Sequence, residues 1–222
     1  MAEPPRRIAP PPRSTAADLT RGRTRPLPED LLREASRRLG IMSLLGAAMW
    51  VLTTVLYHIV DRIIEQDDTS WFAPQPSDAI TVVSVVLSLA LFFYTRRSKR
   101  EPQFLLNLGL VYMVLMSLGV GLIWHWDPIG PSRSTMPVIT WVGAIILMFA
   151  AVLPSTPTKM LIAGLISAST NPIGMLVARA RGLWDFGPTM NIFVMHYPDY
   201  MLVGVAVVIS AVVTRLGQQV AR

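Results

Sequence analysis

The stretch Leu39–Val60, LGIMSLLGAAMWVLTTVLYHIV, decides how the rest of the sequence is interpreted, and it contains no Asp, Glu, Lys or Arg. The hydrocarbon core of a bilayer is about 30 Å thick and takes about 20 helical residues to cross. A core helix of this length in a soluble protein would carry a polar, usually charged stripe at a spacing of about 3.6 residues. Because the stretch carries no charge at all, the sequence predicts a transmembrane helix here.

Further blocks of the same kind follow along the chain, and each is without charged residues. The fourth and the sixth block of the whole series are short for a membrane crossing unless flanking residues such as Met136 or Tyr197 extend them. We therefore predict an all-α, polytopic membrane protein whose membrane domain, residues 39–214, is a six-transmembrane-helix bundle. The blocks after the first are Ala79–Thr95, Phe104–Trp124, Val138–Leu153, Met160–Val177 and Tyr200–Val213.

The composition agrees with a membrane protein and excludes several other classes. The chain has 222 residues, of which 52% are hydrophobic and only 15% are charged, whereas about 25% of the residues of an ordinary soluble domain are charged. There is no cysteine. A disulfide framework, a thiolate metal site and a cysteine nucleophile are therefore excluded.

The distribution of basic residues predicts the orientation of the chain in the membrane. Of the 20 Lys and Arg, 16 fall in segments that share a side with both termini, and four fall on the other side. Because short cytoplasmic segments are enriched in Lys and Arg, both termini are expected to be cytoplasmic. This topology, together with anionic lipid in the inner leaflet, accounts for the net charge of +6. The expected partner is thus the lipid bilayer, and nucleic acid is not needed to explain the basic charge.

Three segments are expected to lie outside the bilayer. Residues 1–28 hold seven of the 18 prolines, which predicts a disordered, Pro/Arg-rich cytoplasmic tail. Residues 29–38 are predicted to form a juxtamembrane helix, because an early proline and two acids of the first turn favour a helix start there. Residues 215–222 contain few helix-breaking residues and are predicted to form a cytoplasmic exit helix.

The three histidines, His58, His125 and His196, are the candidate sensing residues of the sequence. Each is predicted to lie near the outer face of the membrane, with an Asp two or three residues away. Converging His and Asp side chains can bind a metal or respond to pH. No His-x-x-x-His or Glu-x-x-His spacing is present, so polar residues tolerated at a membrane interface are the simpler explanation, and no metal site is expected.

Asn171 and Pro172 interrupt the fifth block, and the proline is predicted to kink that helix. A broken helix can also line a transport site, but a simple kink is favoured here. The blocks contain no Asp, Glu, Lys or Arg that would mark an ion or proton pathway. The sequence therefore argues against a pump or a coupled transporter.

Several ordered motifs between residues 28 and 222 resemble one family. Together they are similar to the N-terminal multi-pass membrane module of bacterial eukaryotic-like serine/threonine protein kinases. In that family a cytoplasmic kinase domain follows the membrane module directly. The motifs are Asp30–Gly40 (DLLREASRRLG), Leu153–Pro157 (LPSTP), Ala178–Trp184 (ARARGLW), His196–Tyr200 (HYPDY), Leu202–Ser210 (LVGVAVVIS) and Val213–Gly217 (VTRLG).

The resemblance implies a location in the bacterial cell (inner) membrane and a role in anchoring a kinase and transmitting a signal to it. The sequence contains no Gly-rich nucleotide loop and no His-Arg-Asp catalytic motif. We therefore expect no catalytic residue and no cofactor site in this chain, with ATP and Mg²⁺ implied only for a kinase domain encoded downstream. The expected protein partners are that kinase domain and a second copy of the chain, as a homodimer. A small transport or channel protein without a kinase, and a passive membrane anchor, remain the alternatives.

Overall fold

The computed structural model describes residues 29–65, 75–98, 100–126, 137, 139–183 and 187–220. Within these ranges the chain is entirely helical apart from short connections, and no strand occurs. The predicted tail, residues 1–28, lies outside the described residues, as do the last two residues of the predicted exit helix. The helices are α2 (Glu29–Glu65), α3 (Pro76–Arg97), α4 (Pro102–Trp124), α5 (Trp141–Val152), α6 (Pro157–Ala168), α7 (Thr170–Ala180) and α8 (Met190–Val220).

The helix starts follow local sequence signals. Gln75 and Asp78 form a capping box at the start of α3. Thr140 caps α5 by accepting a hydrogen bond from the backbone N–H of Val142, and Thr156 caps α6 in the same way through Lys159. The helices α3, α4 and α6 each begin with proline, whose missing N–H costs nothing in a first turn.

Five stretches of helix are long and apolar enough to cross a membrane. The fourth predicted block becomes α5, which has only 12 residues and at about 1.5 Å per residue extends about 18 Å, well short of a bilayer core. The all-α, multi-pass membrane bundle is thus confirmed, with five helical stretches of spanning length in the described residues and a shorter apolar helix in place of the fourth predicted span. The five stretches are Glu29–Val60, Ser77–Arg97, Pro102–Trp124, Pro157–Ala180 and Met190–Gln219.

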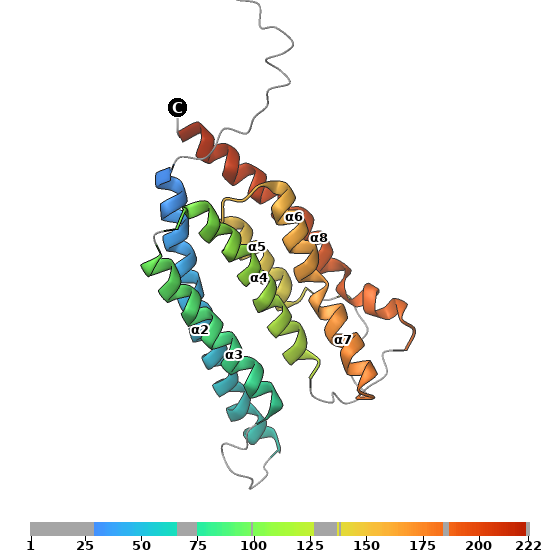
Figure 1. Cartoon of the computed structure of the whole chain (residues 1–222). Helices are drawn as coiled ribbons and strands as arrows, with labels where there is room; N and C mark the ends of the chain where they lie inside the picture. The colour runs from blue at the N-terminus through green and yellow to red at the C-terminus, as the bar shows by residue number, and fades with distance from the viewer. Residues whose placement is uncertain are drawn as a thin grey trace, which may run out of the picture.

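The helices form a bundle in which α5 lies behind α4 in the view of Figure 1. Helices α2 and α3 run side by side as one antiparallel pair, and α4 lies between this pair and the group formed by α6, α7 and α8. Helix α5 packs against α4, α6 and α8. Its side chains Val142, Ile146 and Phe149 are no more than 2% exposed and belong to the main hydrophobic core.

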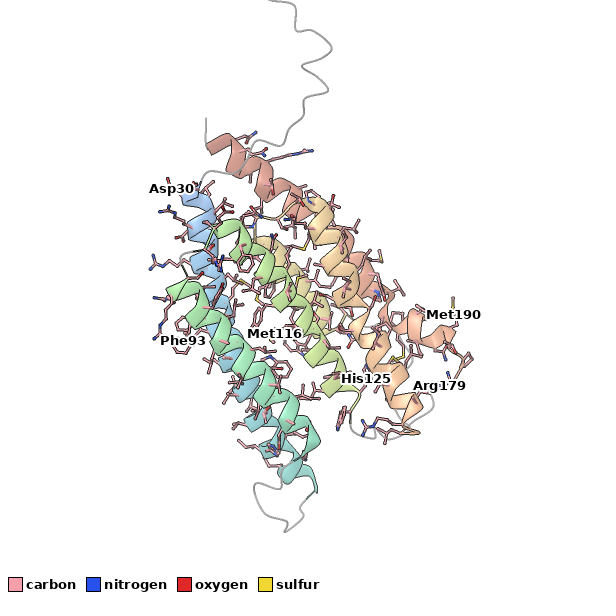
Figure 2. The ribbon with its side chains drawn as sticks, viewed as in Figure 1. Asp30, Phe93, Met116, His125, Arg179 and Met190 are labelled. Carbon is pink, nitrogen blue, oxygen red and sulfur yellow. The ribbon has the colours of Figure 1, made fainter. Side chains whose placement is uncertain are left out.

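The outward faces of the bundle are apolar, as lipid contact requires. On α2, Val51, Leu52, Val55 and Leu56 are each about half exposed. A soluble bundle would cover such a surface with charged side chains. Figure 2 shows side chains projecting outward all along α2 and α3, with Phe93 on this outer surface.

Two long helices join the membrane domain to the segments predicted outside it. Residues 29–38 and the first block are one continuous helix, α2, and α8 runs without a break from Met190 to Val220. The sixth block is therefore extended at both ends, including the Tyr197 side. Figure 1 shows that α2 begins and α8 ends at the same end of the bundle.

Candidate functional site

A buried carboxylate, Asp199, lies in the interior of α8 and is completely inaccessible to solvent. Its Oδ1 accepts a hydrogen bond from the backbone N–H of Thr140 at 3.1 Å, and its Oδ2 accepts one from the Thr140 hydroxyl at 2.7 Å. The side-chain amide of Asn171 donates a further bond to Oδ2 at 3.4 Å. In all three bonds the carboxyl oxygens of Asp199 are the acceptors.

Thr140 is the centre of this network because all the bonding capacity of its hydroxyl is used. The hydroxyl donates its proton to Asp199 and accepts from the backbone N–H of Val142 at 3.1 Å and from Asn171 Nδ2 at 2.7 Å. Because Thr140 is the N-cap residue of α5, its bonds to Asp199 place the carboxyl group at the N-terminus of α5. The helix dipole favours negative charge at this end. Within the described part of the chain, no Lys or Arg forms an ion pair with it. We call Thr140, Asn171 and Asp199 the polar centre.

Asn171 reaches the polar centre because the fifth predicted span is broken beside it. Pro172 has no N–H to donate to the carbonyl of Ala168, four residues earlier, so α6 ends at Ala168. The helical bonding resumes with the Ile173 N–H on the Ser169 carbonyl at 3.0 Å. The predicted interruption at Asn171 and Pro172 thus lies in the first turn of α7, directly after the break at Ser169.

Close packing of glycines holds α7 against α4 at the same level. A Cβ at Gly174 would overlap the carbonyl oxygen of Gly121, and a Cβ at Gly121 would lie 2.7 Å from the carbonyl oxygen of Thr170. The Thr170 hydroxyl bonds to the carbonyl of Ser117 across this contact at 2.9 Å. The backbone positions that surround Asn171 are therefore tightly fixed.

The structure brings two of the candidate histidines together and separates the third. The rings of His125 and His196 are both 3% exposed and pack edge to face, with centroids 6.0 Å apart. His196 lies one turn before Asp199 on α8. His58, in contrast, contacts Asp78 at 3.0 Å between α2 and α3. Figure 2 places His125 at the end of α4, at the same end of the bundle as Arg179.

His196 also contacts a methionine. Its Nε2 lies 2.9 Å from the sulfur of Met175, which can only accept a hydrogen bond. The Nδ1 of His196 is buried and has no hydrogen-bond partner among the residues that the structure describes, and the same is true of Asn171 Oδ1.

The arrangement places a buried, hydrogen-bonded carboxyl group in a helix that is long and apolar enough to span a membrane. No group of three His, Cys, Asp or Glu side chains in the described ranges is placed to hold a metal ion. An ionisable residue inside a membrane span is costly and is generally found where a membrane protein senses, couples or conducts. The polar centre is therefore the candidate functional site of the chain.

The sequence alone placed Asp199 outside the sixth block, whereas the structure places it within α8, in a helical stretch that is long and apolar enough to cross a membrane. The buried positions of α8 recur every three or four residues, and Asp199 belongs to this stripe. The exposed positions of α8, such as Met201 and Val205, are apolar as well, so the sequence itself carries no periodic signal for an inward-facing carboxylate. The stripe consists of Ile192, His196, Asp199, Val203, Ala206 and Ser210.

Comparison of the chain with models of known protein families, with curated proteins and with solved structures gave no match. The fold and the polar centre define a helical, multi-pass membrane protein with a buried carboxylate.

Proposed function

We propose that the chain is the membrane-anchoring and signal-transmitting region of a bacterial receptor-type serine/threonine protein kinase, with both ends on the cytoplasmic side. The single observation that carries the proposal is α8. This one helix contains Asp199 of the polar centre and continues to Val220, at the end of the bundle where α2 begins. A continuous helix can carry a displacement from the membrane interior to a domain attached beyond it.

The contacts of α8 support a role in transmission. At Asp199 the helix is tied by hydrogen bonds to α5 and α7. Further along, the hydroxyls of Ser210 and Thr214 both donate to the carbonyl of Ser155, at 2.6 and 3.1 Å. A stimulus that alters the hydrogen bonds of Asp199, or those of Ser210 and Thr214, would shift α8 relative to α5 and α6. Interhelical hydrogen bonds of this kind also hold membrane bundles together, so the insertion experiment below separates transmission from anchoring.

The first experiment is to read the gene downstream of Arg222. An open frame that encodes a Gly-rich nucleotide loop and a His-Arg-Asp motif supports the proposal, and a stop codon directly after Arg222 refutes it. With an open frame, one, two or three alanines are inserted after Val220 in the full-length protein, and autophosphorylation is measured in membrane vesicles.

Each inserted residue rotates the following domain by about 100°, whereas seven residues restore the helix phase to within about 20°. The one-, two- and three-residue insertions should therefore change autophosphorylation, and the seven-residue insertion should restore it. Equal activity in all the variants would contradict transmission through a rigid α8. If a lipid anchor replacing residues 29–220 preserved the regulation of the kinase, the membrane domain would be a passive anchor.

A second candidate function is a small membrane transport or channel protein, and the observation that favours it is Asp199 beside the broken span. Carboxylates next to interrupted helices form ion and proton sites in transporters. The discriminating measurement is uptake of protons and monovalent cations into vesicles that contain the purified chain. Uptake that is lost in Asp199→Asn would support transport, and an absence of uptake in the unaltered chain would reject it.

A further inference from the structure

A cavity of about 620 Å³ lies where the start of α2, the end of α3 and the start of α4 meet. It is at the end of the spans, at the level where α2 begins, and is distinct from the polar centre. Its lining comes from three helices and from the connection between α3 and α4. The lining residues are Glu29, Arg33, Ser36, Arg37, Thr95, Arg96, Ser98, Arg100, Glu101, Pro102 and Leu105. We call it the arginine cavity.

The charges around the arginine cavity do not balance. Of the arginines, Arg33 is paired with Glu29 at 3.3 Å. Arg96 stacks on the ring of Phe92, with its guanidinium carbon 5.1 Å from the ring centroid, and this contact leaves its charge uncompensated. Arg37 and Arg100 form no ion pair with an acid in the part of the chain that the structure describes. Glu101 is the remaining acid of the lining, so the cavity has an excess of positive charge.

The floor and surroundings of the cavity are suited to a ligand that is anionic at one end and apolar at the other. Leu105 and Ser36 are buried, at 4% and 6% exposure, and close the cavity on its inner side. Directly along the spans lie large exposed apolar side chains, including Phe93 and Phe104 at 52% and 50% exposure. Figure 2 shows Phe93 on the outer surface of α3, four residues before α3 ends at Arg97.

We propose that the arginine cavity binds the phosphate of an anionic phospholipid headgroup, with the acyl chains lying along α3 and α4. Arginine presents a planar fork of donors that matches a phosphate. Basic pockets between helices at a membrane surface are known to bind anionic headgroups. The proposal does not depend on the kinase and would apply equally to a transport protein.

The test is native mass spectrometry of the purified chain in a neutral detergent, titrated with phosphatidylglycerol. One phosphatidylglycerol per chain should bind saturably, and phosphatidylcholine should bind far more weakly. Each arginine near an anionic headgroup contributes about a fivefold gain in affinity. The variant R37Q/R96Q/R100Q should therefore bind phosphatidylglycerol about 100-fold more weakly, and the single variant R37Q about fivefold more weakly.

The matched control is R38Q/R97Q/R215Q, which removes the same charge from arginines outside the cavity lining. Its affinity should fall much less than that of R37Q/R96Q/R100Q, because these three arginines do not line the cavity and Arg38 is already paired with Glu34. Equal losses in the two triple variants, or equal binding of phosphatidylcholine, would overturn the proposal. Inorganic phosphate is titrated separately: displacement of the lipid by phosphate at equal concentration would mean that the site takes free phosphate, which overturns the lipid assignment.

A size-exclusion profile and a helical circular dichroism spectrum establish that each variant is folded. If the triple variant did not fold, R37Q alone would decide, since Arg37 is exposed on the first turns of α2 and is not part of the buried core. Unchanged binding in folded R37Q would count against the proposal.

Discussion

Removing the carboxylate of Asp199 tests whether the polar centre holds the bundle together. Asp199→Ala deletes the acceptor of two bonds from Thr140 and one from Asn171. A hydrogen bond to a charged group contributes about 1.5–3 kcal/mol in soluble proteins, whereas interhelical bonds in membranes average about 0.6 kcal/mol and reach about 1.7 kcal/mol. Since the bonds here involve a buried carboxylate, we expect a loss of about 2–5 kcal/mol in the free energy of unfolding.

The contribution of one bond is separated by a double-mutant cycle between Asp199→Ala and Thr140→Val. The valine keeps the shape of threonine and removes the hydroxyl that lies 2.7 Å from the carboxylate. Unfolding is followed by circular dichroism during titration of mixed micelles with sodium dodecyl sulfate. The coupling free energy should be about 1–2 kcal/mol, because the bond is short and buried.

The matched control is Thr54→Val, which removes a hydroxyl at 2.8 Å from that of Thr81, between α2 and α3. This bond shares no partner with Asp199, so its effect should add to that of Asp199→Ala within about 0.5 kcal/mol. A coupling between Thr140 and Asp199 no larger than that of the control would refute the reasoning.

Two further predictions concern packing and topology. Gly174→Ala should lower the free energy of unfolding by about 1–3 kcal/mol, because its Cβ would overlap the backbone of α4. The control is Gly204→Ala, whose Cβ would meet nothing within 4 Å. In the dodecyl sulfate titration this variant should be neutral or stabilised by up to about 1 kcal/mol. Because the chain has no cysteine, single cysteines report sidedness: Asp30→Cys and Gln218→Cys should react with a membrane-impermeant thiol reagent from one side of a vesicle, and Arg179→Cys from the other. Labelling of all three from the same side would contradict the arrangement of the bundle.

Much of the fold could be predicted because length and the absence of charge are local properties. The block Phe104–Trp124 ends at the same residue as α4, and Ala79–Thr95 lies wholly within α3. The length of α5 could not be predicted in this way. Its start is set by Thr140, whose hydroxyl bonds to a residue 59 positions away, and no local pattern reports a contact of that range.

The polar centre was missed for a related reason. The sixth block was defined by the absence of charged residues, so it began after Asp199 and excluded the residue. In the structure the helix continues through Pro198 and Asp199 back to Met190, and the buried carboxyl group is satisfied by hydrogen bonds from Thr140, which caps α5, and from Asn171 on α7. The break of the fifth block was foreseeable from Pro172, but the position of Asn171 beside Asp199 depends on helix packing.

Pro198 gives α8 an uneven stiffness. Its nitrogen cannot close the usual bond within the helix, and it stands immediately before the anchored Asp199. From there to Val220 the helix extends about 30 Å. A change in the bend of α8 at Pro198 would therefore move its C-terminal end by much more than it moves Asp199. A tilt of about 10° at Pro198 would displace Val220 by about 5 Å.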